Sequence, residues 1–237
     1  MSLHLSIIED KVQELMKEFK DDSHLAFLKL VHSLVRDCDY EDLDSEDIVD
    51  GADEKQLDAI CIDDDEAEDF ANITIIQAKY VDSFKTNYLT LLGNGLQWAF
   101  KKPRKAYEKL ANKKLVRKIR EIRDIRNRRG TSQMRVTVYF ATKGDTRKLS
   151  RDFKQELEEI RGQFAGVEWN SFDLHPVGAS ELIAFLQTNE RRSKKITDRL
   201  TICYDVNKPS YIKYTIKGRK GLVCTVPGRE IARLVSG

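Results

Sequence analysis

Residues 57–62 read Leu-Asp-Ala-Ile-Cys-Ile, and residues 73–80 read Ile-Thr-Ile-Ile-Gln-Ala-Lys-Tyr. Both are short apolar runs of the kind that forms β-strands, and the acidic, turn-rich stretch 63–72 separates them. Two strands joined in this way predict an antiparallel hairpin. If Asp58 pairs opposite Gln77, the centre of the hairpin falls within the acidic stretch, so the expected register and the expected loop agree.

The predicted hairpin brings three polar side chains toward one place. Side chains alternate between the two faces of a strand, so Gln77 and Lys79 point the same way, and Asp58 lies opposite Gln77. A carboxylate, an amide oxygen and an ammonium group can together bind a divalent metal and stabilise the charge of a phosphate under attack. A single Asp or Lys at a strand end is more often only solvated, so this prediction depends on the combination.

A longer pattern surrounds these residues. Residues 50–60 read Asp-Gly-Ala-Asp-Glu-Lys-Gln-Leu-Asp-Ala-Ile, and the second run ends in Gln-Ala-Lys-Tyr. This resembles the restriction-endonuclease-like nucleases, the PD-(D/E)xK superfamily, in the Mrr-like branch that has Gln in place of an acidic residue. The resemblance implies that Asp58, Gln77 and Lys79 are catalytic. It also implies a Mg²⁺ (or Mn²⁺) ion held by Asp58, Gln77 and the backbone carbonyl of Ala78.

A third segment narrows the resemblance. Residues 221–232 read Gly-Leu-Val-Cys-Thr-Val-Pro-Gly-Arg-Glu-Ile-Ala. With the two segments above, they are similar to the N-terminal half of the abortive-infection phage-resistance (AIPR) proteins, which are bacterial defence proteins. The similarity covers residues 25–237 and implies a role in defence against phage. That family commonly has Gly just before the hydrophobic-Asp pair, whereas this chain has Gln56.

Further ligands are less well defined by the sequence. A carboxylate from the front of the domain often joins such metal sites, and the candidates are Glu14, Glu46 and Asp50. His24 and His32 flank an apolar helical stretch without metal-ligand spacing, so we expect them to be packing or surface residues. The four cysteines lie far apart and form no Cys-x-x-Cys, so we expect reduced thiols.

Charge is unevenly distributed along the chain. The net charge is only +2, but residues 1–70 are acidic and residues 101–129 are strongly basic. Such asymmetry suggests a polyanionic partner, and the candidate nucleic-acid contacts are Lys101, Lys102, Arg104 and Lys105. Two alternatives remain open for the basic segment. Its charges are also what the wet face of an amphipathic helix requires, or they dock on the acidic front half.

Periodicity and turn signals predict an α/β fold: a restriction-endonuclease-like mixed central sheet flanked by helices, with a small C-terminal β meander. Residues 1–190 form the expected nuclease domain, with N-terminal helices within 1–36 and a basic helix over 101–129. Residues 191–237 form the C-terminal extension. The other expected helices cover 87–100 (interrupted at 93–95), 146–164 and 180–187 (capped by Ser180). The other expected strands cover 134–142, 167–174, 200–205, 211–217 and 222–226, with a short helix at 229–235.

The expected function is metal-dependent endonuclease activity on duplex DNA. Two alternatives use the same chain: a non-catalytic module that binds nucleic acid or protein on a nuclease-like scaffold, and an RNA-directed nuclease with the same site. A homodimer fits cleavage of both strands of a duplex. No apolar run approaches the ~18 residues of a membrane span, so no membrane partner is expected and the expected location is cytoplasmic.

Overall fold

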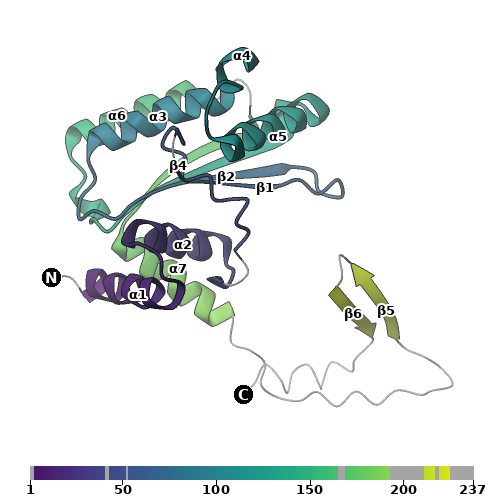
Figure 1. The fold of residues 1–237 in the computed structure, drawn as a ribbon, viewed down its shortest axis with the longest axis horizontal. Coiled ribbons are helices and arrows are strands. Elements are labelled where there is room, and N and C mark those ends of the chain that lie inside the picture. Colours follow the sequence, from purple (N-terminus) through teal and green to yellow (C-terminus); the bar gives the residue numbers. More distant parts are fainter. Residues whose placement is uncertain are drawn as a thin grey trace. The chain divides into compact units, whose positions relative to one another are not determined.

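The computed structural model describes residues 3–40, 43–51, 53–164, 169–192, 211–216 and 219–224. Its larger sheet has four strands in the order β1-β2-β3-β4 (Figure 1). Strand β1 (Ala59–Asp63) is antiparallel to β2 (Ala71–Lys79). Strands β3 (Met134–Thr142) and β4 (Ser171–Val177) then extend the sheet in parallel. The predicted α/β class, the hairpin and the parallel additions are therefore confirmed.

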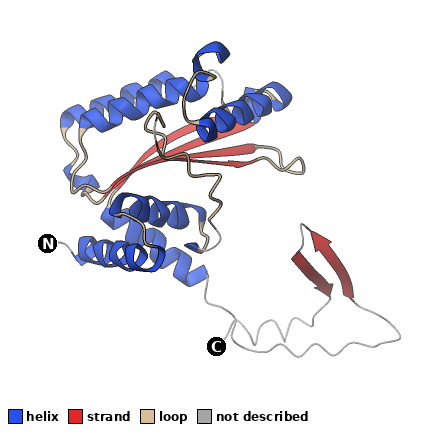
Figure 2. Ribbon diagram, viewed as in Figure 1, coloured by secondary structure: helices blue, strands red, loops and turns tan. Residues whose placement is uncertain are grey.

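Helices cover both faces of this sheet, as Figure 2 shows. One face packs against α3 (Thr86–Phe100), α5 (Lys113–Arg129) and α6 (Arg151–Phe164). The other face packs against α1 (Leu3–Phe19), α2 (Ser23–Arg36) and α7 (Ala179–Arg192). Strand β2 shows why two cores form: Ile73 and Ile75 belong to the first, while Ile76 and Ala78 belong to the second. A strand buried on both faces is apolar at nearly every position, and the run 73–76 shows this.

The basic segment is not one helix. It contains the short α4 (Arg104–Tyr107) and the separate α5. Pro103 stands at the N-cap of α4, and Asn112 caps α5 by accepting a hydrogen bond from the Leu115 amide at 2.9 Å. A new cap satisfies the free amides of a new helix start. The prediction of a continuous helix over 101–129 is therefore wrong.

Gly93 and Gly95 do not interrupt α3, contrary to the prediction. A Cβ atom on Gly95 would lie 2.1 Å from the backbone oxygen of Lys55, and one on Gly93 would lie 3.0 Å from Ile160. These glycines allow close packing of α3 against the loop before β1 and against α6. Glycine is needed at these positions because it lacks a side chain, not because its backbone is more flexible.

Two helix starts also differ from expectation. The segment predicted to start a helix at 146 forms a 3₁₀ turn, Thr146–Lys148, and α6 begins at Arg151. Ser180 does not cap α7, which begins at Ala179. Glu181 satisfies the start of α7 instead, because its carboxylate accepts bonds from the Gly178 amide at 2.9 Å and the Thr146 hydroxyl at 2.6 Å.

Residues 1–189 and 190–237 form two separate compact units. Within the second unit, β5 (Tyr211–Ile216) and β6 (Arg219–Cys224) form an antiparallel pair. The strand predicted to begin at residue 222 begins at Arg219 instead. The expected strand 200–205 and helix 229–235 lie outside the described residues. Among the described helices, none has the length and apolar character needed to cross a membrane.

Candidate metal centre

The start of β1 and the end of β2 place the central residues. Ala59 lies opposite Ile76, which is the register that the sequence predicted, and Asp58 immediately precedes β1. The Asp58 amide donates to the Ile76 carbonyl at 3.0 Å. In turn, the Ala78 amide donates to Asp58 Oδ2 at 2.8 Å. The carboxylate is therefore held at the sheet edge where the parallel strands β2 and β3 end.

Asp58 and Lys79 lie together. Lys79 Nζ is 3.9 Å from Asp58 Oδ2, and the lysine side chain is 18% exposed whereas Asp58 is fully buried. Burial raises the pKa of Asp58 to about 6, against the lowering effect of Lys79 and of the Ala78 amide. Asp58 Oδ1 is buried and has no hydrogen-bond partner. A buried carboxylate oxygen in this state is unfavourable, and a bound cation would satisfy it.

His24 and Asp50 complete a group around Asp58. One ligand atom from each of the three residues lies within 4.8 Å of the others. His24 Nε2 is 3.7 Å from Asp50 Oδ1, and this contact raises the pKa of His24 and lowers that of Asp50. The side chains of His24 and Asp50 are 35% and 27% exposed. Solvent therefore reaches the group from their side, while Asp58 closes its inner side.

Backbone pairing explains the position of Asp50. The segment before β1 runs along that strand, with a bridge between Ile48 and Ala59. The amides of Val49 and Asp50 both donate to the Asp58 carbonyl at 3.0 Å. Asp50, one of three carboxylates proposed from the sequence, is thus held beside Asp58. His24 was expected to be a packing or surface residue, and no spacing in the sequence points to its place in this group.

Gln77 is buried, and only one of the two polar atoms of its side-chain amide has a hydrogen-bond partner. Nε2 donates to Gln56 Oε1 at 3.0 Å, while Gln77 Oε1 has no partner. Gln56 itself has φ 61°, in the left-handed region. Gly adopts this conformation without strain, whereas a residue with a side chain does not. Gln56 therefore accepts backbone strain at a position from which its side chain holds Gln77.

The other proposed carboxylates lie elsewhere. Glu14 is on the exposed side of α1 and is bonded to Lys11 at 2.8 Å. Glu46 pairs with Arg117 of α5. Neither belongs to the group formed by His24, Asp50 and Asp58.

The proposed nucleic-acid contacts lie beyond the end of α3, a helix about 22 Å long. Lys101 donates to the Gln163 carbonyl at 3.0 Å, and Lys102 lies 5.8 Å from the centre of the Trp98 ring. Arg104 pairs with Glu108 at 2.7 Å. Lys105 is exposed.

Several cations of α5 dock on acidic segments of the same chain. Lys118 Nζ lies 2.7 Å from Asp47, and the guanidinium groups of Arg128 and Arg129 lie 2.5 and 2.6 Å from Asp64. One of the two alternatives for the basic segment, docking on the acidic front half, therefore holds for these residues. Their charges are not free for a polyanion.

A cavity of about 290 Å³ lies among the loops after β2 and β3 and the start of α7. Its lining includes Lys143 and Arg147 but neither Asp58 nor Lys79. Lys143 is already paired with Glu9 and Asp82, and Arg147 with Asp145. The unsatisfied oxygens at Asp58 and Gln77 make the sheet edge, rather than this cavity, the better candidate site.

No family model, curated protein or solved structure matches this chain.

Proposed function

We propose that this protein is a metal-dependent endonuclease that hydrolyses phosphodiester bonds in duplex DNA. The observation that carries the proposal is the buried Asp58 carboxylate, which has one unsatisfied oxygen, an ammonium group at 3.9 Å and two partly exposed ligand groups beside it. The mixed sheet flanked by helices is compatible with a restriction-endonuclease-like fold. The resemblance to AIPR proteins supports bacterial defence against phage as the setting.

The residues present fit a divalent metal ion. Carboxylate and amide oxygens are the ligands preferred by Mg²⁺ and Mn²⁺, and the unsatisfied Oδ1 of Asp58 and Oε1 of Gln77 are such oxygens. The His24 imidazole favours Mn²⁺ over Mg²⁺, since nitrogen ligands suit transition metals better. When bound, the ion would supply Lewis acidity toward a phosphate oxygen and a more acidic water.

The chain's own groups would then perform the remaining tasks. Asp58 and Asp50 hold negative charge on the inner and outer sides of the group. Lys79 places an ammonium group where the scissile phosphate would lie and offsets the negative charge that develops there. The Ala78 amide and the Gln56 side chain keep Asp58 and Gln77 in place through the bonds described above.

The test is cleavage of plasmid DNA, and separately of RNA, with Mn²⁺, with Mg²⁺ and with EDTA. We expect metal-dependent cleavage that falls at least about a hundredfold in Asp58→Ala and in Lys79→Ala. Asp69→Ala and Lys148→Ala are matched controls at exposed positions and should cleave as the native chain does.

Cleavage by Asp58→Ala at the native rate would overturn the assignment. So would an inert native chain whose thermal unfolding midpoint does not rise with Mn²⁺, because a ligand that binds only the folded state must stabilise it. Cleavage of RNA but not of DNA would show that the protein is an RNA-directed nuclease instead.

A further inference from the structure

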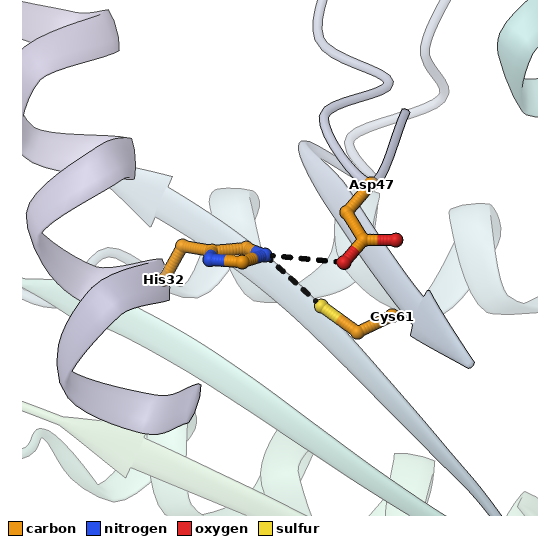
Figure 3. Close-up of side chains that lie close together, drawn as sticks. All are labelled: His32, Asp47 and Cys61. Atoms are coloured by element: carbon orange, nitrogen blue, oxygen red, sulfur yellow. Dashed lines mark hydrogen bonds and ion pairs between the residues drawn. The ribbon is translucent and has the colours of Figure 1, made fainter. Parts of the chain in front are cut away.

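A second cluster of metal-ligating side chains lies along the same elements. Figure 3 shows Asp47 and Cys61 turned toward one nitrogen of His32. His32 Nε2 is 3.2 Å from Cys61 Sγ and 3.5 Å from Asp47 Oδ2. His32 and Cys61 are buried, and the Asp47 side chain is 15% exposed.

The two clusters have the same plan. Each takes a histidine from α2, an aspartate from the segment before β1, and a third residue from β1 or its start. His24 and His32 are eight residues apart on α2, which is about 12 Å along the helix axis. The chemistry of the clusters differs, however. The first has two carboxylates, whereas the second combines imidazole, thiol and carboxylate, a set that suits Zn²⁺ rather than Mg²⁺.

The separations in the second cluster fit a tetrahedral metal. With Zn–N near 2.1 Å and Zn–S near 2.3 Å, tetrahedral geometry places N and S about 3.6 Å apart and N and a carboxylate O about 3.3 Å apart. The observed 3.2 Å between His32 and Cys61 and 3.5 Å between His32 and Asp47 differ from these by a few tenths of an ångström. Lys118 donates to Asp47 Oδ1 at 2.7 Å, which leaves Oδ2 facing His32. Hydrogen bonds of this kind commonly orient metal-binding carboxylates. The partly exposed Asp47 gives a water access to a fourth position.

We propose that His32, Asp47 and Cys61 bind one Zn²⁺ ion that joins α2, the segment before β1 and β1. Binding displaces the Cys61 thiol proton to solvent and leaves a thiolate on the metal. The ion would fasten together the same three elements that carry His24, Asp50 and Asp58. The inference does not rest on the proposed nuclease activity, because its tests measure binding and stability alone.

The first test uses the native chain and thermal unfolding with Zn²⁺ or Mg²⁺. We expect the unfolding midpoint to rise with micromolar Zn²⁺ in the native chain, in Cys38→Ala and in Asp58→Asn. Cys61→Ala in the Asp58→Asn background should lose this rise. Excess Mg²⁺ should not displace Zn²⁺. If this double variant keeps the whole effect of Zn²⁺, the proposal fails.

The second test removes every other thiol. The chain has four cysteines, so the combination Cys38→Ser, Cys203→Ser and Cys224→Ser leaves Cys61 alone. Titration of this variant with Co²⁺ should produce a thiolate-to-cobalt absorption band that Zn²⁺ abolishes. Adding His32→Ala should weaken Co²⁺ binding at least about tenfold. A folded three-serine variant without this band would show instead that Cys61, His32 and Asp47 form only a metal-free hydrogen-bonded cluster.

Discussion

Asp58 is a buried carboxyl group whose environment disfavours its charge. Its pKa of about 6 lies above the ordinary value of 3.8, chiefly because burial removes water from it. The folded state therefore binds a proton at Asp58 more tightly than the unfolded state does. Below about pH 4 both states are protonated and there is no cost. Above pH 6 both are ionised, and the folded state bears a cost of about 3 kcal/mol.

A first prediction concerns Asp58→Asn without metal. The neutral amide removes this cost, so the variant should be more stable than the native chain at pH 8, by about 1–3 kcal/mol. The difference should shrink as the pH falls from 6 to 4. Urea unfolding at pH 4, 6 and 8 measures it. Mn²⁺ should stabilise the native chain and not the variant. A difference independent of pH would contradict the assigned environment of Asp58.

At the scale of elements, the site depends on how closely α3 approaches the loop before β1. Gly95 makes this approach possible, because any Cβ would meet the Lys55 backbone oxygen. The next residue in that loop is Gln56, which holds Gln77, and Asp58 follows two residues later. A change in how α3 packs would therefore displace Gln56 and Asp58, which lie within three residues of Lys55.

A second prediction follows for Gly95→Ala. Backbone cannot yield as easily as a side chain, so we expect a loss of about 1–3 kcal/mol in the free energy of unfolding and weaker Mn²⁺ binding. Gly162→Ala is the matched control, because a Cβ there meets nothing within 4 Å and Ala favours a helix interior. It should be neutral or stabilising. Equal stability of the two variants in urea unfolding would refute the packing argument.

Over the larger unit, residues 1–189, the acidic and basic segments partly neutralise each other. Arg129 and Asp64 form an ion pair in which the side chains are only 10% and 12% exposed. The pair joins the end of α5 to the loop that connects β1 and β2. This pairing brings together opposite charges that lie far apart in the sequence.

A third prediction tests this pairing. Arg129→Ala removes one of the two guanidinium partners of Asp64, which keeps Arg128, and also removes the donor to the Asp65 and Glu68 carbonyls. It should destabilise the chain by about 1–3 kcal/mol. Arg126→Ala, on the same helix, should change stability much less.

If DNA binds at residues 101–105, Lys105→Ala should weaken binding and reduce its salt dependence, while Arg129→Ala should not. Calorimetry and DNA titration at two salt concentrations measure these effects. Weaker DNA binding in Arg129→Ala, with stability unchanged, would show that Arg129 contacts DNA rather than stabilising the fold through Asp64.

Periodicity and turn signals determined the hairpin and its register, because alternation along a strand is a local property of the chain. The same local rules wrongly predicted that Gly93 and Gly95 interrupt α3 and that α4 and α5 form one helix. Periodicity does not detect close packing between elements or a new helix cap. Only the tertiary structure decided that His24 joins Asp50 and Asp58, that His32 meets Cys61, and that Arg117, Arg128 and Arg129 of α5 are paired with acidic residues. Each of those contacts joins segments far apart in the sequence, so it exists only once helix and sheet have packed together.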